Sequence, residues 1–294
     1  MEYSVVIATL DRTERLLAAI SSLCRQTVPP ALVVVVDASD NPEPNRLALA
    51  AQPFPFAIHH LVVEQRSAAE QRNQGIQTTN TSLVAVIDDD VVLEPTVFEL
   101  LVSTIKQGVA AVSARERGTG HRIPSSLLRF YYRLQAGYDD ATFGTRLFGP
   151  GINCLPCYEK QTGLLLEAEW LPSTCLLLRR DAFEAAGGFP TFKEYSFMED
   201  VWLTASIRKS GRKLLFHTAA WFDHDSQSSG FKKQPFRLAV MRMKHRRRLS
   251  REVLEMTPWE CEGKLLLQKG FDAIYIARCR RQGWVQELAG TLVG

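Results

Sequence analysis

Three consecutive aspartates, Asp88 to Asp90, directly follow a run of apolar residues in the stretch "LVAVIDDDVVLEP". In extended backbone Asp88 and Asp90 project to the same side, because side chains alternate along a strand. Two such carboxylates repel each other and resist desolvation unless a cation neutralises them. Oxygen ligands in small number suit Mg²⁺ or Mn²⁺, which keep waters and accept phosphate oxygens. The spacing therefore favours a metal that meets a diphosphate, although the triplet alone fits a solvated strand end equally well.

A second pair of acids, Glu199 and Asp200, occurs in "MEDVW" at the start of a segment with helical spacing. The positive end of the helix dipole favours an ionised carboxylate, which can accept a proton from a hydroxyl group. We take Asp200 as the preferred general base and keep Glu199 as the alternative, because adjacent acids point in different directions. Either acid could instead only favour the start of the helix.

Four apolar stretches in the first third of the chain predict the strands that position these groups. They are "YSVVIAT", "ALVVVVDASD", "FAIHHLVVE" and "SLVAVIDDD", and segments with helical spacing separate them. Apolar strands that alternate with helices indicate a parallel sheet covered on both faces. Ligands bind beyond the carboxyl ends of such strands. Residues 9–12, 37–39 and 88–90 all fall at those ends, so we expect them to form one binding site.

In the second half of the chain, the sequence predicts a strand near 175–178 and a short helix closed by two glycines. It then predicts a helix from Glu199 and a final strand through "RKLLFHTAAWFDHDS". Residues 115–169 lack sustained periodicity and are typical of binding loops or a lid. Cys154 and Cys157 have the CxxC spacing, but no second pair completes a zinc site, so we expect free thiols in a loop.

Seven segments in order resemble the family 2 glycosyltransferases, which are inverting enzymes of GT-A fold with nucleotide-sugar donors. The segments are "VVIATLDRTERLLAAISSLCRQT", "VVVVDASD", "RSAAEQRNQGI", "VAVIDDDVVLEP", "WLPSTCLLLRRDAFEAAGGF", "FMEDVWLTASIRKSG" and "DHDSQSSG". The resemblance covers about residues 3–230 and implies an α/β fold with a GT-A (Rossmann-like), mostly parallel central sheet and helices on both faces. Beyond it, "PWECEGKLLLQKGFDAIYIARCRRQG" predicts one or two further helices, and so a helical C-terminal extension. The expected domains are 1–230, divided into a nucleotide-binding half 1–112 and an acceptor and catalytic half 113–230, and a basic extension 231–294.

The resemblance also implies roles for residues of the donor pocket. Thr9 and Arg12 would border the nucleotide. Asp37 would hydrogen-bond the base or the ribose, and Arg72 would contact the base or a phosphate. The alternative for Asp37 and Arg72 is a surface ion pair.

For the aspartate triplet, the resemblance implies a DxD pair. Asp88 would lie near the ribose, the sugar and the metal, Asp89 would belong to the donor-binding residues, and Asp90 would bind the metal directly. His224 in "AWFDHDS" would complete a mixed nitrogen and oxygen site compatible with Mn²⁺, although lone histidines are more often structural.

On the acceptor side, the resemblance places Trp170 and Ser173 in the wall of the pocket and Asp200 or Glu199 as the base. An indole can form a platform for a sugar ring but is equally suited to a core. This segment departs from the commoner family pattern, which leaves the donor sugar open.

The expected reaction is inverting transfer of a sugar from a UDP-, GDP- or dTDP-sugar to a saccharide or lipid-linked acceptor hydroxyl, assisted by Mn²⁺ or Mg²⁺. A nucleotidyltransferase would need a glycine-rich phosphate loop after the first strand, and "ATLDRTER" has no glycine. A non-catalytic nucleotide-sugar sensor or membrane-associated module is the other alternative. The presence of both acidic motifs argues against it.

The chain has 294 residues, 46% of them hydrophobic, with a net charge of +3 that is too small to indicate nucleic acid as a partner. No apolar run reaches the ~18 residues that span a bilayer, and we expect a cytoplasmic protein that is at most peripheral to the inner face of the membrane. The segment 232–251 carries nine Lys or Arg and no acid. It fits an anionic membrane surface. It equally fits a polyanionic acceptor or nucleic acid, or a solvated helix that packs Phe236, Val240 and Met243 onto the domain.

Overall fold

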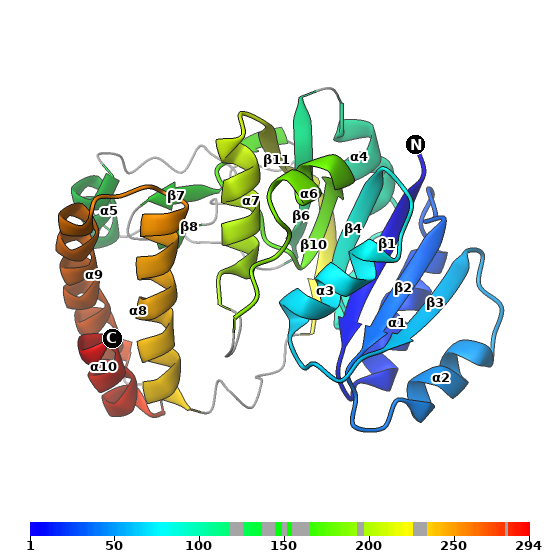
Figure 1. Cartoon of the computed structure of the whole chain (residues 1–294), viewed down its shortest axis with the longest axis horizontal. Coiled ribbons are helices and arrows are strands. Elements are labelled where there is room, and N and C mark those ends of the chain that lie inside the picture. Colours follow the sequence, from blue (N-terminus) through cyan, green and yellow to red (C-terminus); the bar gives the residue numbers. More distant parts are fainter. Residues whose placement is uncertain are drawn as a thin grey trace. The chain divides into compact units, whose positions relative to one another are not determined.

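The computed structural model describes the chain except residues 107, 118–125, 137–144, 149–151, 155–164, 193–196, 226–233 and 280–281, together with some side chains between 127 and 154. The chain divides into two compact units (Figure 1). Unit 1 contains Met1–His121, Thr142–Thr145 and Pro156–Ser226, and unit 2 contains Arg122–Ala141, Arg146–Leu155 and Gln227–Gly294. Cys157 and the side chain of Cys154 lie outside the described residues, whereas Cys24, Cys175, Cys261 and Cys279 are free thiols.

Unit 1 is built on a nine-stranded sheet whose first four strands in the chain pair only in parallel with one another. These are β1 (Tyr3–Thr9), β2 (Leu32–Asp37), β3 (Ala57–Val62) and β4 (Leu83–Asp88). The sheet has the order β3-β2-β1-β4-β10-β6-β11-β5, and β9 pairs with β11. β1, β2 and β4 are almost completely buried, as expected for strands covered on both faces.

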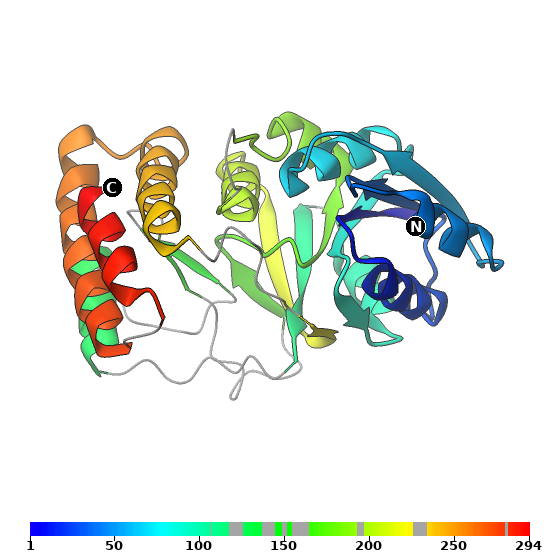
Figure 2. The same cartoon turned by 90° about the horizontal axis from the view of Figure 1, so that it is seen from below.

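Helices cover both faces of this sheet (Figure 2). They are α1 (Thr13–Cys24), α2 (Glu43–Ala50), α3 (Ala68–Gln77), α4 (Val97–Thr104), α6 (Arg180–Ala185) and α7 (Glu199–Lys209). Alternate residues of β1 enter two separate core clusters because successive side chains point to opposite faces. Val5 and Ile7 pack with α1, α2 and α4, whereas Val6 packs with α3, α6 and α7.

The remaining strands turn the sheet into a mixed one. They are β5 (Val91–Leu93), β6 (Val109–Glu116), β9 (Leu165–Ala168), β10 (Cys175–Arg179) and β11 (Lys213–His224). β10 runs antiparallel between β4 and β6, and β11 runs parallel to β6 and antiparallel to β5. The expected α/β sheet with helices on both faces is confirmed, and the strands and helices predicted around 175–224 are present.

The described residues of unit 2 form four helices and a short hairpin. They are α5 (Ser126–Ala136), β7 (Arg146–Phe148), β8 (Ile152–Cys154), α8 (Pro235–Glu252), α9 (Pro258–Cys279) and α10 (Trp284–Val293). α10 packs tightly on α8 because Gly290 lies where any Cβ would collide with the backbone of Phe236. The unit therefore includes α5 and the hairpin as well as the C-terminal helices, and the boundary at 230/231 stays a prediction.

The basic helix α8 buries an apolar face within unit 2, as one of the two sequence interpretations proposed. The buried apolar residues are Leu238, Ala239, Met241, Met243 and Leu249. The prediction that Phe236 belongs to this buried face was wrong, because its side chain is 45% exposed. Phe236 lies in the first turn of α8, and its backbone, not its ring, packs against Gly290 of α10. Among the described helices, none has the length and hydropathy needed to cross a bilayer.

Candidate active site

The carboxyl ends of β1, β2 and β4 bring distant polar residues to one edge of the sheet. In the strand register Thr9 lies opposite Asp37, and Ala8 lies opposite Asp88. Gln71 of α3 donates to the carbonyl oxygens of Thr9 and Val36 at 3.0 and 2.8 Å, which fastens the helix to two of these ends. The structure thus places the residues of three separate loops at the same edge, as the parallel topology predicts.

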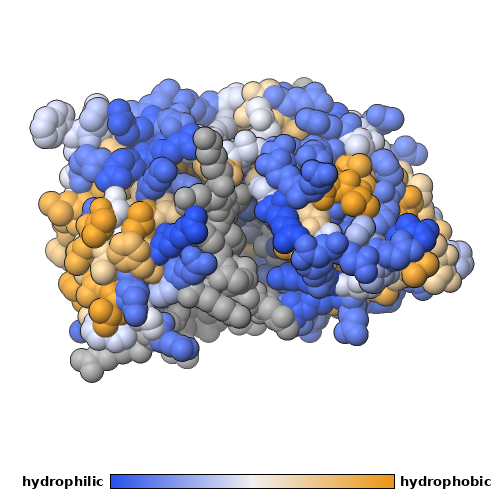
Figure 3. All heavy atoms as spheres, turned by 60° about the horizontal axis from the view of Figure 1, so that its bottom comes forward, coloured by the Kyte–Doolittle hydropathy of each residue, from blue (hydrophilic) through white to orange (hydrophobic). Residues whose placement is uncertain are grey.

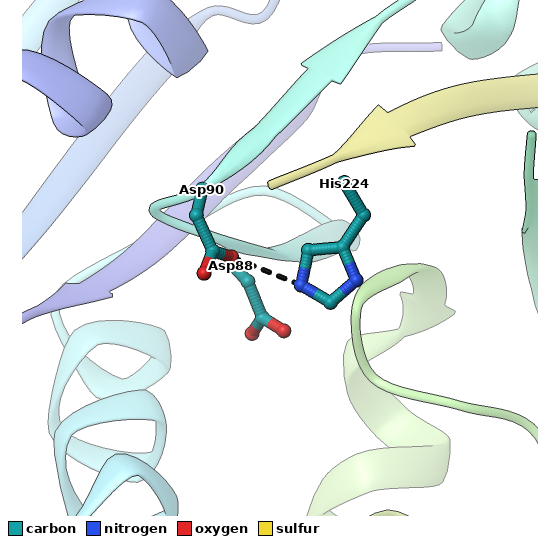
Figure 4. Close-up of side chains that lie close together, drawn as sticks. All are labelled: Asp88, Asp90 and His224. Carbon is teal, nitrogen blue, oxygen red and sulfur yellow. Dashed lines mark ion pairs between the residues drawn. The ribbon is translucent and has the colours of Figure 1, made fainter. Parts of the chain in front are cut away.

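Asp88, Asp90 and His224 form the acidic cluster of the site (Figure 4). One potential ligand atom from each lies within 4.8 Å of the other two. His224 reaches the aspartates because β11 pairs with β5, so that His224 stands opposite Val91. Two carboxylates and an imidazole are a donor set suited to Mn²⁺ and acceptable to Mg²⁺. The three residues that the sequence assigned to the metal therefore fit a divalent ion.

Positive groups already surround Asp90. His224 Nε2 lies 3.1 Å from Asp90 Oδ1, Arg12 Nη1 3.2 Å from Oδ2, and Arg15 Nη1 3.8 Å from Oδ2. Burial alone would raise the pKa of Asp90, but the hydrogen bond and charge of His224 and the two arginines outweigh it and lower the pKa. Contacts with Asp90 and Glu116 raise the pKa of His224 to about 10. A metal must displace that proton before His224 can act as a ligand.

Asp89 is not part of this cluster and instead connects the surrounding loops. Thr9 Oγ1 donates to Asp89 Oδ2 at 2.8 Å, and Arg12 Nη1 donates to Oδ1 at 3.1 Å. Burial raises the pKa of Asp89, against the opposing effects of these two partners. Both oxygens are thus engaged within the protein, and the donor-binding roles of Asp89, Thr9 and Arg12 stay predictions.

Arg72 connects the aspartate cluster to the second acidic pair. Its Nη2 donates to Asp88 Oδ1 at 2.6 Å and its Nη1 donates to Glu199 Oε1 at 3.1 Å. The guanidinium also lies 5.5 Å from the ring centroid of Phe189. Burial would lower the pKa of Arg72, but the charges of Asp88 and Glu199 raise it. The side chain is 6% exposed, so the surface ion pair weighed from the sequence is wrong for Arg72.

Glu199 and Asp200 begin α7 directly after Met198, whose φ of 66° is left-handed. This backbone turn brings the acids to the site at the helix N-terminus. Burial raises the pKa of Asp200 to about 7, and the neighbouring Glu199 adds to the shift. Val201 N donates to Asp200 Oδ1 at 2.7 Å, and the backbone of Ser173 also contacts this carboxylate. Burial raises the pKa of Glu199 as well, although Arg72 opposes the shift.

Asp37 is fully buried in a network of its own. Its oxygens accept hydrogen bonds from Ser39 N at 2.9 Å and Asn45 Nδ2 at 2.8 Å, and His60 Nε2 lies 2.9 Å away. Burial would raise the pKa of Asp37, but these hydrogen bonds lower it. Asp37 therefore holds the loop after β2 together, and a surface ion pair is wrong here too. Its contact with a base or ribose stays a prediction.

Trp170 and Ser173 lie in the segment that precedes β10. Trp170 is 3% exposed and its backbone pairs with the Thr145 hydroxyl. Ser173 is 6% exposed and contacts Asp200 through its backbone. The predicted acceptor-side roles of both residues stay predictions, although the contact with Asp200 places Ser173 beside the candidate base.

Three residues of the site were missed by the sequence interpretation. Arg15 follows Arg12 by one helical turn, and Glu116 stands at the end of β6 beside His224. Phe189 lies under Arg72 because Asn73 pairs with its backbone N–H and C=O, each at 2.9 Å. The spacing of Arg12 and Arg15 could have revealed the second arginine, whereas no local pattern connects Asn73 with a residue so distant in the chain.

A family profile decides the classification. The model of the family described as "Glycosyltransferase like family 2" matches residues 2–249. The chain belongs to this family. A curated relative of this glycosyltransferase-like protein is the glucosyl-dolichyl phosphate glucuronosyltransferase of Haloferax volcanii, which is 32% identical over 158 residues. That match covers 50% of this chain and 48% of the relative, so the chain spans about half the length of the curated relative it matches.

Solved structures show the same fold. GalNAc-T7, crystallised with UDP, GalNAc and Mn²⁺, matches with a TM-score of 0.61 at 15% identity. The match covers 78% of this chain and 45% of the GalNAc-T7 chain. The mannosyltransferase PcManGT from Pyrobaculum calidifontis, in complex with GDP-Man and Mn²⁺, matches with a TM-score of 0.58 at 16% identity. The match covers 99% of this chain and 84% of the PcManGT chain. This family 2 protein therefore has the GT-A fold, and both the resemblance and the fold class expected from the sequence are confirmed.

Proposed function

We propose that this protein transfers a sugar from a nucleoside-diphosphate sugar to an acceptor hydroxyl, with inversion at the anomeric carbon and assistance from a divalent metal. The observation that carries the proposal is the arrangement around Arg72. Its guanidinium joins Asp88 of the acidic cluster to Glu199, the neighbour of an acid whose pKa is raised to about 7. A cation site and a candidate base thus share one edge of the sheet, as transfer from a diphosphate to a hydroxyl requires.

The chemistry of the site supports a diphosphate as the leaving group. Asp88, Asp90 and His224 would hold the metal, which when bound neutralises negative charge on phosphate oxygens. Arg15 Nη1 is buried, and within the described residues it has no hydrogen-bond acceptor. Its contact with Asp90 at 3.8 Å is too long for a hydrogen bond. A buried donor without a hydrogen-bond acceptor is costly, and a phosphate oxygen would satisfy it. The solved relatives named above were crystallised with UDP or GDP-Man, and the UDP-, GDP- or dTDP-linked donor of this chain belongs to the proposal.

Asp200 is the residue we assign as the general base. Glu199 is less suited because Arg72 holds its carboxylate, and a carboxylate paired with a cation binds a proton less readily. The pKa of Asp200 near 7 keeps a large fraction of the carboxylate ionised at neutral pH while making it a stronger base than an exposed aspartate. The backbone N–H of Val201 donates one hydrogen bond to this carboxylate and thereby orients it. Asp200 would accept the acceptor hydroxyl's proton as that oxygen attacks the sugar.

The acceptor is a saccharide or a lipid-linked sugar in this proposal. The name of the curated relative includes a glucosyl-dolichyl phosphate, which is a lipid-linked sugar. Ser173 lies beside Asp200 and so belongs to the part of the site that the acceptor would approach. A non-catalytic sensor of nucleotide sugars would have no need of a buried acid held near neutral pKa.

A donor panel tests the proposal. The full chain is incubated with UDP-, GDP- and dTDP-sugars, Mn²⁺ or Mg²⁺, and simple saccharide or polyprenyl-phosphate sugar acceptors, and released nucleoside diphosphate is measured. We expect acceptor-dependent release with at least one donor, and a loss of about 10² to 10⁴ in rate for Asp200→Asn, the range of general base catalysis.

Asp181→Asn serves as the matched control, because Asp181 is a half-exposed aspartate paired with Arg212 away from the cluster. It should retain the rate of the wild type. Release that is equal in Asp200→Asn and in the wild type would overturn the assignment of the base. Retention of the anomeric configuration in the product, read by NMR, would overturn the inverting mechanism.

A further inference from the structure

Helix α9 of unit 2 exposes an apolar stripe opposite its buried side. The buried side carries Cys261, Leu265, Gln268 and Ile276. With 3.6 residues per turn, the opposite side gathers Trp259, Leu266, Leu267 and Ile274, which are 90%, 72%, 48% and 53% exposed. Gly263 and Gly270 lie on the same stripe, and a Cβ at either would meet no atom within 4 Å. The six residues of this stripe carry no charge, and the charged residues Glu260 and Arg278 lie at its edge. Surface helices normally place charged residues in the middle of their exposed side, so an apolar stripe there is unusual.

The two helices that flank α9 extend this apolar character. α5 contacts α9 through the stacked rings of Tyr131 and Phe271, whose centroids are 4.1 Å apart. α10 contacts it through Lys269 Nζ, 3.2 Å from the Leu292 carbonyl oxygen. The exposed apolar residues on these neighbours are Phe130 and Leu134 of α5 and Val285, Leu292 and Val293 of α10, each more than half exposed. Figure 3 shows hydrophobic side chains gathered over this unit. We call these five residues together with the α9 stripe the apolar surface.

Unit 2 is also strongly basic. Its sequence contains 18 Lys and Arg against 8 Asp and Glu, whereas the whole chain has 35 against 32. Several of the acids are already paired with α8, since Arg246 contacts Asp272 and Arg247 contacts Glu262. An apolar surface on a unit of excess positive charge is complementary to a bilayer with anionic headgroups. The apolar side chains enter the boundary of the acyl chains while the cations attract the lipid phosphates.

We propose that the apolar surface docks unit 2 on an anionic lipid bilayer. The proposal goes beyond the sugar transfer proposed above and does not depend on it. It differs from the membrane contact expected from the sequence, because α8 uses its apolar residues for the core of unit 2 and pairs Arg246, Arg247 and Arg248 with acids. The lipid-inserting side chains are those of α9, α10 and α5, and α8 adds to the positive field of the unit.

A second copy of the chain is the less suitable occupant of the apolar surface. A twofold dimer uses the same patch on both subunits, so it would bring two basic units against each other. An exposed tryptophan at the end of the stripe also suits a bilayer, because its amphipathic ring is favoured at the headgroup level. Trp259 is 90% exposed.

Vesicle flotation of the full chain tests the proposal. The vesicles contain equal parts of phosphatidylglycerol and phosphatidylcholine, or phosphatidylcholine alone, at low and at high salt. We expect the wild type to float with the anionic vesicles at low salt and less at high salt, because salt screens the headgroup charge. The double variant Leu266→Gln/Ile274→Gln should partition at least about tenfold more weakly, because it replaces two apolar side chains that would enter the lipid with polar ones.

The matched control is Leu47→Gln/Val62→Gln, which changes two apolar residues of unit 1 that are 55% and 53% exposed. It should float like the wild type. Circular dichroism confirms folding, and substitutions at such exposed positions have small effects on stability. The proposal is overturned if the wild type does not float, if the α9 variant floats equally well, or if light scattering shows a dimer that the α9 variant dissociates while no vesicle binds.

Discussion

Replacement of Asp200 by asparagine is expected to stabilise the folded protein above neutral pH. In the folded state the pKa of Asp200 is raised from 3.8 to about 7, first by burial and second by Glu199. The unfolded chain releases this proton near the ordinary pKa of 3.8. Between this pKa and about 7, the folded state therefore binds more protons than the unfolded chain. Stability is therefore fully present below the unfolded pKa and is lost as pH rises through the folded pKa. Asparagine cannot ionise and avoids the loss.

The magnitude follows from the size of the shift. Each pKa unit corresponds to about 1.4 kcal/mol, so a rise from 3.8 to about 7 corresponds to about 4 kcal/mol in the free energy of unfolding. This figure is a ceiling, because relaxation and water penetration reduce the cost of buried charge. For a large domain about 2 °C of melting temperature accompanies each kcal/mol. We therefore expect Asp200→Asn to melt several degrees higher than the wild type at alkaline pH.

Thermal melts of both proteins across the pH range from about 5 to 8.5 check this expectation. The difference in melting temperature should grow with pH and level off above the folded pKa. Asp181→Asn is the control. Hydrogen bonds and charges of Arg212 and Arg179 lower the pKa of Asp181 against the effect of its burial, so its replacement should slightly destabilise the fold instead. A difference for Asp200→Asn that is absent, negative or independent of pH would refute the buried, raised-pKa base.

Two further substitutions probe the same site. Arg72→Gln leaves the carboxylates of Asp88 and Glu199 without their shared cation and should cost about 3 to 5 kcal/mol in urea unfolding, the usual cost of breaking a buried ion pair; an unchanged midpoint would show that the pair is dispensable. His224→Gln removes the only imidazole of the cluster described by the structure and should raise the Mn²⁺ concentration for half-maximal donor turnover at least about tenfold; an unchanged Mn²⁺ dependence would exclude His224 as a ligand.

Much of the sheet could be predicted from the sequence because its signals are local. The strands β1, β2 and β4 are continuous apolar runs that end in polar residues, and the parallel topology then requires those ends to meet. The face of α8 was less predictable, because both its sides carry apolar residues. The backbone of Phe236 packs against Gly290 of α10 while its side chain is 45% exposed, and this contact joins residues more than fifty positions apart.

The acids and the histidine of the site were predictable, whereas their connections were not. Asp88, Asp90 and Asp200 stand in short motifs that keep their residue types together in the sequence. Arg72 instead pairs with Glu199, which lies 127 positions later in the chain, and also with Asp88. The contact with Glu199 arises only when α3 and α7 pack on the same face of the sheet. The sequence therefore indicates which groups are candidates for the chemistry, and the tertiary packing decides which of these candidates lie together.

Binding of nucleotides in the presence and absence of Mn²⁺ tests the central claim most directly. A ligand that binds only the folded state raises its melting temperature. The account predicts that UDP, GDP or dTDP raises the melting temperature more with Mn²⁺ than without it, and that Asp90→Asn removes the Mn²⁺-dependent part. Failure of every nucleotide to shift the melt with any divalent metal, or an undiminished Mn²⁺-dependent shift in Asp90→Asn, would contradict it.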